Sequence, residues 1–147
     1  MDMNTPEMKA IAEAIQQPDK AISRAMLLKL WERLSPTGDP MQVSTMAHFL
    51  ADTETDPASE LEWDLRALEA VVGSRAPEDL EPVSDQLVGL LPSLHLSVAE
   101  GYRRLGEIDT ARKHVEAGAN RIGVLADDAY GNLVRGGLRR LQGLLGI

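Results

Sequence analysis

The sequence predicts an all-α protein of six or seven helices, arranged as antiparallel helical hairpins in a single domain spanning residues 1–147. Apolar residues recur at spacings of three and four along almost the whole chain, and no segment alternates strictly enough for a strand. Aromatic residues make up only 3% of the chain. Leu, Ala, Val and Met must therefore fill the core, as they do between packed helices.

Helix-start signals recur in the first half of the chain, each a capping residue followed by proline. Thr5-Pro6 opens a short polar helix that ends near residues 17–18, and we expect fraying over residues 1–18. Asp39-Pro40 follows a cluster of helix breakers at residues 35–40 and starts another helix. The apolar stripe of the helix before these breakers contains Ile22, Met26, Leu27, Leu30, Trp31 and Leu34.

Residues 40–73 read as one antiparallel helical hairpin. Its first helix starts at Pro40, and Asp56-Pro57 starts its second helix, which Gly73 ends. The stripe of this second helix contains Leu61, Leu65, Leu68 and Val72. Residues 74–83 are rich in proline and acidic residues, which predicts a loop between hairpins.

The second half of the chain predicts three further helical segments. Pro92 interrupts a pattern that runs from residue 84 to residue 105, which indicates a kink or a fresh helix start. A return helix runs from Ile108 to about Val124. The terminal helix, residues 127–145, places Leu133, Leu138, Leu141 and either Leu144 or Leu145 on one side. Gly136-Gly137 within it indicates close packing against a neighbour, or a bend.

Residues 92–125 carry the spacing of small and large side chains at which two helices cross closely. These positions are Ala99, Tyr102, Gly106, Ala111, Val115 and Gly118. In order and spacing the stretch resembles one tetratricopeptide repeat of the bacterial type. It departs from that family at His95, where a large residue such as Trp is favoured, and at Gly118, which replaces the usual Ala.

Residues 40–73 resemble a second, degenerate copy of this repeat. Leu61, Leu65 and Leu68 repeat the spacing of the second helix of the clearer copy, but the small residues are absent. Leu61 precedes its equivalent, Ala111, by 50 residues, whereas the family period is about 34 residues, so an insertion lies between the copies. The resemblance implies a right-handed superhelix of paired helices.

The resemblance also implies a protein-interaction scaffold, in which the first helix of each pair lines a groove for a peptide or partner helix. On this chain the groove positions are Ser93, Leu96, Ser97, Glu100, Arg103 and Arg104. Glu100 stands where chaperone-binding members use Asn in a carboxylate clamp, so that role is not expected. One or two repeats leave end faces uncovered, and a homodimer is therefore expected.

Charge and composition exclude several classes of function. The net charge of −8 lacks the positive field that binds nucleic acid, and a basic edge of Arg135, Arg139 and Arg140 is too small to supply it. Residues 1–100 carry a net charge of −11 and residues 101–147 of +3. This asymmetry indicates a solvated acidic surface with basic helix ends, or head-to-tail self-association.

The chain has no cysteine, and therefore no disulfide or thiol chemistry. Its first residues lack the pattern of a signal peptide, and no apolar run is long enough to cross a membrane. We therefore expect a cytoplasmic location and no membrane partner.

A ladder of potential metal ligands runs at four-residue intervals through His48, Asp52, Asp56, Glu60 and Asp64. Such spacing places the groups on one helix face, where two facing pairs bind a metal. The alternative is a solvated acidic face in which Asp56 caps a helix. A metal-dependent enzyme is accordingly a remote third hypothesis, and no cofactor is expected.

The remaining aromatic and histidine residues predict packing rather than chemistry. Trp31 and Trp63 lie beside apolar stripes and are interpreted as core anchors. His95 and His114 belong to the two helices of the clear repeat and approach each other, with His95 in the core and His114 exposed. No nucleophile and base are identified, so an enzyme is not expected. The sequence favours a non-catalytic scaffold that binds an unidentified protein or peptide, with a regulatory sensor of a peptide or small ligand as the alternative.

Overall fold

The computed structural model describes residues 5–73 and 85–147, and these residues form helices and no strands. The seven α-helices are α1 (Pro6–Ile15), α2 (Lys20–Leu34), α3 (Pro40–Ala51), α4 (Pro57–Val72), α5 (Leu91–Arg104), α6 (Ile108–Ala119) and α7 (Ala129–Leu145). Three short 3-10 helices accompany them: η1 (Ser35–Thr37), η2 (Asp85–Leu90) and η3 (Ile122–Val124). The all-α prediction is confirmed for the described residues, and the predicted 74–83 loop lies outside them.

The predicted helix starts are confirmed at three positions. Thr5 accepts a hydrogen bond from the Met8 amide, and Asp39 and Asp56 cap α3 and α4 in the same way, each followed by proline at the first helical position. Gly38 sits at φ 71° directly before Asp39, a left-handed conformation that favours glycine. Local sequence chemistry therefore sets these boundaries.

The predictions for the second half hold in part. α5 starts afresh at Leu91 with Pro92 in its first turn, directly after η2. The return helix ends at Ala119, short of the predicted Val124. The backbone tightens there, because the Arg121 amide bonds to the carbonyl of Gly118 three residues back rather than four.

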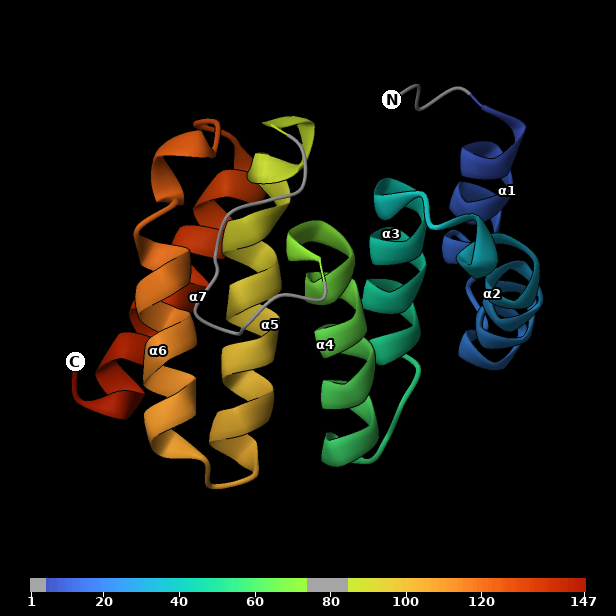
Figure 1. Ribbon diagram of the computed structural model, residues 1–147. Coiled ribbons are helices and arrows are strands. Elements are labelled where there is room, and N and C mark those ends of the chain that lie inside the picture. Colours follow the sequence, from blue (N-terminus) through green and yellow to red (C-terminus); the bar gives the residue numbers. More distant parts are fainter. Residues whose placement is uncertain (1–4, 74–84) are drawn as a thin grey trace.

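The helices pair as two antiparallel hairpins, α3 with α4 and α5 with α6, and α4 lies beside α5 (Figure 1). α1 and α2 cover the α3 side, whereas α7 packs on α6 and α5 at the other end. α1 contributes Met8, Ile11 and Ala14 to the core. The antiparallel hairpins are thus observed, and α7 lies against α5 near Leu96 and Glu100, two of the predicted groove positions.

Two predicted stripes each have one residue on the wrong side of the helix. On α2, Ile22 is 50% exposed and Ser23 is buried in its place, whereas Leu27 and Leu34 are buried as predicted. On α7, Leu133 is 73% exposed, whereas Leu138, Leu141 and Leu145 are buried. A rotation of one residue moves a side chain by about 100° around a helix, and apolar spacing alone tolerates such a shift.

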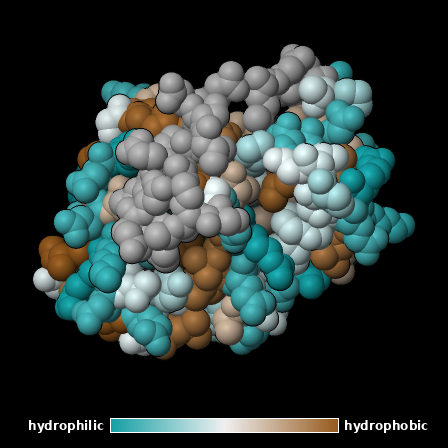
Figure 2. Space-filling view, in the orientation of Figure 1, coloured by the Kyte–Doolittle hydropathy of each residue, from teal (hydrophilic) through white to brown (hydrophobic). Residues whose placement is uncertain are grey.

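The face of the molecule in Figure 2 is largely hydrophilic, with small hydrophobic patches between polar residues. Among the described residues, no helix combines the length and apolar character needed to cross a membrane.

Candidate functional site

A hollow of about 280 Å³ opens between α4, α5 and α7. Its lining consists of Asp52, Glu60, Asp64, Leu96, Ser97, Glu100, Gly137, Arg140 and Leu141. Three of the six groove positions predicted on α5 are among these residues. Half of the predicted groove positions therefore line this hollow.

Close approach of α7 to α5 forms the apolar side of the hollow. A Cβ atom added at Gly137 would lie 2.7 Å from Cδ2 of Leu96, so only glycine lets the helices come this near without displacing Leu96. Gly136 faces open space by the same measure. The predicted close packing at this pair of glycines is therefore observed at Gly137.

Arginines neutralise the two glutamates of the hollow. Arg103 donates two hydrogen bonds to Glu100, at 2.9 and 2.8 Å, and this interaction lowers the pKa of the Glu100 carboxyl. Arg140 approaches the same carboxylate at 3.9 Å. Arg104 of α5 reaches across to Glu60 of α4 at 3.2 Å. These partly exposed pairs add little stability, but they fix the charge pattern at the rim.

The two aspartates differ from the glutamates. Asp64 is only 4% exposed, and its one ion-pair partner among the described residues is His48, whose Nδ1 lies 3.7 Å from Oδ1, beyond hydrogen-bonding distance. Burial raises the pKa of Asp64, and Asp64 in turn raises the pKa of His48. Asp52 follows α3 and is exposed. Sequence spacing had placed both aspartates on a solvated face, whereas Asp64 is enclosed by neighbouring helices.

The other predicted groove positions lie around the hollow or away from it. Arg103 and Arg104 hold the glutamates at the rim. Ser93 is not part of the lining, and its hydroxyl donates to the carbonyl of Leu90 at 3.4 Å in the first turn of α5.

Most of the predicted repeat-packing positions lie between α5, α6 and α7. Ala99, Ala111 and Val115 are fully buried, whereas Gly106, at φ 81°, is exposed in the turn after α5. A Cβ at Gly118 would lie 3.1 Å from Leu138 and 3.2 Å from the Cβ of His95. Tyr102 is half-buried and stacks on the ring of His114.

The two histidines meet as predicted, with their Nδ1 atoms 2.9 Å apart. His95 is 1% exposed, in agreement with its predicted core position. His114 is 9% exposed, so the prediction that it is exposed is wrong: α6 turns it toward α5, between Tyr102 and His95. Burial lowers the pKa of His95 to about 4 and also lowers that of His114.

The structure keeps most of the ladder of potential metal ligands together, since Asp52, Glu60 and Asp64 line the same hollow and His48 lies 3.7 Å from Asp64, but their other contacts do not form a metal site. Asp56 caps α4 and accepts hydrogen bonds from the amide and hydroxyl of Ser59, and Glu60 pairs with Arg104. Within residues 5–73 and 85–147, no three His, Asp or Glu side chains are arranged to hold a metal ion.

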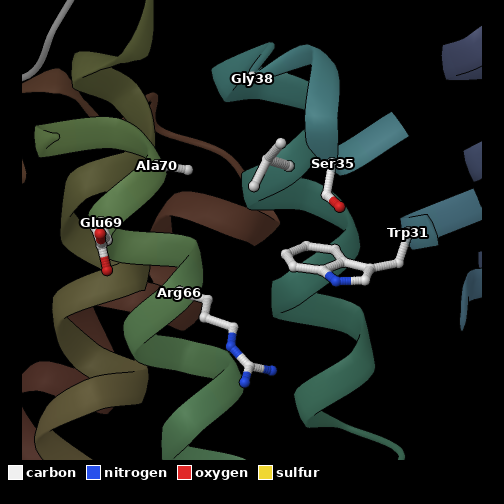
Figure 3. A pocket seen from close by; sticks show the side chains of 7 residues that line it. Trp31, Ser35, Gly38, Arg66, Glu69 and Ala70 are labelled. Atoms are coloured by element: carbon white, nitrogen blue, oxygen red, sulfur yellow. The ribbon is translucent and has the colours of Figure 1, made fainter. Parts of the chain in front are cut away.

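A second hollow, of about 530 Å³, lies beside Trp31 where η1, α3 and α4 meet (Figure 3). Trp63 is buried as predicted, whereas Trp31 is half-buried and lines the hollow. Their rings form a T-shaped pair with centroids 5.0 Å apart. Arg66, which the sequence analysis did not single out, lies over Trp63 at 4.5 Å and also lines the hollow.

No protein-family model matches the chain, and no curated protein or solved structure shows significant similarity to it. Its function is therefore inferred from the hollows and the side chains that form them.

Proposed function

We propose that this chain is a non-catalytic protein-interaction module, similar to a short tetratricopeptide-repeat array, whose groove over α5 receives a segment of a partner. The observation that carries the proposal is the hollow between α4, α5 and α7. Leu96, Ser97 and Glu100, three positions that the family resemblance assigns to a groove, line it together. The hollow combines apolar surface with charged groups, a combination typical of binding sites.

The arrangement of charges also fits a binding role better than a catalytic one. The glutamates of the hollow are held by Arg103 and Arg104. Carboxylates fixed in ion pairs orient a partner more readily than they transfer protons. The acidic first part of the chain favours partners of opposite charge and faster association with them.

The proposal is tested by affinity capture from a native cell extract, followed by direct measurement with the purified partner. Ser97→Arg fills the hollow, and charge reversal at Glu100, Arg103 and Arg104 inverts its rim. Either change is expected to weaken binding at least tenfold. Glu116→Arg, on the exposed surface of α6, is the matched control. Unchanged affinity in both groove variants would refute the groove assignment.

The alternative function, a regulatory sensor, is favoured by the hollow beside Trp31, because its size suits a small ligand. The chain has two tryptophans, so Trp63→Phe leaves Trp31 as the sole tryptophan, whose fluorescence is excited selectively at long wavelength. A ligand that changes this fluorescence and raises Tm would support the sensor function.

We also propose that the chain forms a homodimer through the exposed apolar residues of α7. Four apolar residues near or on this helix are exposed: Tyr130 at 51%, Leu133 at 73%, Leu144 at 54% and Ile147 at 56%. Large exposed apolar side chains along an end helix favour an interface with a second copy. A second copy related by twofold symmetry would cover each face with its equivalent.

A further inference from the structure

The most unusual group in the hollow between α4, α5 and α7 is the carboxylate of Asp64. The residue is 4% exposed and lines the hollow, so its remaining accessible surface faces that space. Among the described residues it accepts no short hydrogen bond, since Nδ1 of His48 lies 3.7 Å away. A buried carboxylate without close donors is costly, because desolvation is not compensated. A cationic group entering the hollow would supply the missing donor.

The charges around Asp64 favour a cation over an anion. Four carboxylates line the hollow against one arginine, Arg140. The two glutamates are already paired with Arg103 and Arg104, and Arg140 approaches Glu100. Asp52 and Asp64 are left, and they lie near enough for Asp52 to help raise the pKa of Asp64. A positive ligand group would relieve this repulsion.

The rest of the lining selects the shape of the ligand. Leu96 and Leu141 supply apolar surface beside the carboxylates, and Gly137 adds no side chain to fill the space. Lysine and arginine carry an apolar stem that ends in a charged head, and the stem packs readily on apolar surface. A volume of about 280 Å³ is at the lower end for ligand pockets, which suits one side chain rather than a cofactor.

We propose that this hollow binds the side chain of a lysine or arginine in a partner segment, with its charged head on Asp64 and Asp52 and its stem against Leu96 and Leu141. The inference rests on the proposed function, because it names the chemistry of the partner that the groove receives. Replacement of the incoming cation by a neutral side chain would leave Asp64 enclosed with only the more distant His48 beside it, so recognition is selective for charge.

The test uses the full chain and blocked pentapeptides of alanine with one central residue. Lysine, arginine, norleucine and glutamate peptides are titrated into ¹⁵N-labelled protein, and amide shifts are followed by NMR. We expect saturable shifts at Ser97, Gly137 and Leu141 with lysine or arginine. Norleucine, which keeps the stem and lacks the charge, is expected to bind at least tenfold more weakly.

Substitutions separate the hollow from general surface charge. Asp64→Asn is expected to weaken the lysine peptide at least tenfold, and Asp52→Asn, at an exposed position with no cost of burial, severalfold. Asp127→Asn removes the same charge at an exposed position outside the hollow and is expected to change nothing. If Asp64→Asn does not fold, Asp52→Asn with Asp127→Asn decides the result.

Several outcomes would overturn this inference while leaving the interaction module intact. Equal shifts with norleucine would show an apolar site, and equal weakening by Asp127→Asn would show nonspecific attraction. If neither cationic peptide causes shifts but the protein still captures a partner whose binding Ser97→Arg weakens, the groove binds a group other than a lysine or arginine side chain. If Ser97→Arg also has no effect on capture, the proposed function itself is refuted.

Discussion

Nδ1 of His95 lies 2.9 Å from Nδ1 of His114 in the interior between α5 and α6. One nitrogen must carry a proton and the other must accept it, so the contact requires that at least one ring is neutral. Protonating the accepting ring would set two N–H groups against each other. The pair therefore joins α5 and α6 only while at least one of the two rings stays neutral.

The first prediction concerns the acid stability of the protein. Burial lowers the pKa of His95 to about 4 in the folded state, whereas an unfolded histidine titrates near 6.5. Below pH 6.5 the unfolded chain binds a proton that the folded chain does not, so stability falls as pH falls. The difference amounts to about 3 kcal/mol of the free energy of unfolding, lost between pH 6.5 and about 4.

Urea denaturation at a series of pH values measures this loss. His95→Gln is expected to flatten the acid limb, because it removes the titrating group. His48→Gln is the control, since Asp64 raises the pKa of His48, opposite to the direction at His95. An acid limb unchanged by His95→Gln would contradict the assignment.

The second prediction compares neighbouring glycines in α7. A Cβ at Gly136 meets nothing within 4 Å, so Gly136→Ala is expected to raise the free energy of unfolding by up to about 1 kcal/mol through helix propensity. The same substitution at Gly137 must displace Leu96. It is therefore expected to gain less stability or lose some, and to weaken binding in the hollow. Equal stabilisation of both variants in urea denaturation would show that α7 does not pack this closely.

The third prediction is that the lysine peptide binds more tightly as pH rises through the pKa of His48. Protonated His48 supplies a positive charge to Asp64 and competes with the ligand, whereas neutral His48 does not. The other charged groups that face the hollow or its rim are Asp52 after α3, Glu60 on α4, Glu100, Arg103 and Arg104 on α5, and Arg140 on α7. His48→Gln is expected to remove most of this increase in affinity with pH. An increase of the same size in that variant would show that another group causes it.

The fourth prediction concerns self-association. Light scattering after size-exclusion chromatography is expected to give a dimer for the native chain and a monomer for Leu133→Glu with Leu144→Glu. Val124→Glu, at an exposed apolar residue outside α7, is the control and is expected to leave the dimer intact. A native monomer at high micromolar concentration would exclude the proposed homodimer.

Helix boundaries were the most predictable part of this fold. The side chains of Thr5, Asp39 and Asp56 accept hydrogen bonds from amides two or three residues away. A few neighbouring residues therefore determine where each helix begins. Pro92 likewise acts within its own turn. The orientation of a helix depends instead on partners distant in sequence, and for this reason the faces of Ile22 and Leu133 were predicted wrongly.

The candidate site was predictable only from its α5 side. The resemblance to a repeat pointed to Leu96, Ser97 and Glu100, and four-residue spacing made Asp64 visible as part of a ladder. The residues next to Asp64 in the sequence do not indicate that its side chain is buried. This burial depends on the packing of α4 against α5 and on α7, which lines the other side of the hollow. Both α5 and α7 come after residues 74–84 in the chain.

The hollow is assembled from α4, α5 and α7, with Asp52 at the end of α3. During synthesis, a chain that has emerged only as far as α6 lacks Gly137, Arg140 and Leu141, and has one open side where the site should be. The proposed binding site is thus complete only once α7 has docked. A partner that binds this hollow would prefer the chain with α7 in place to one in which α7 has detached.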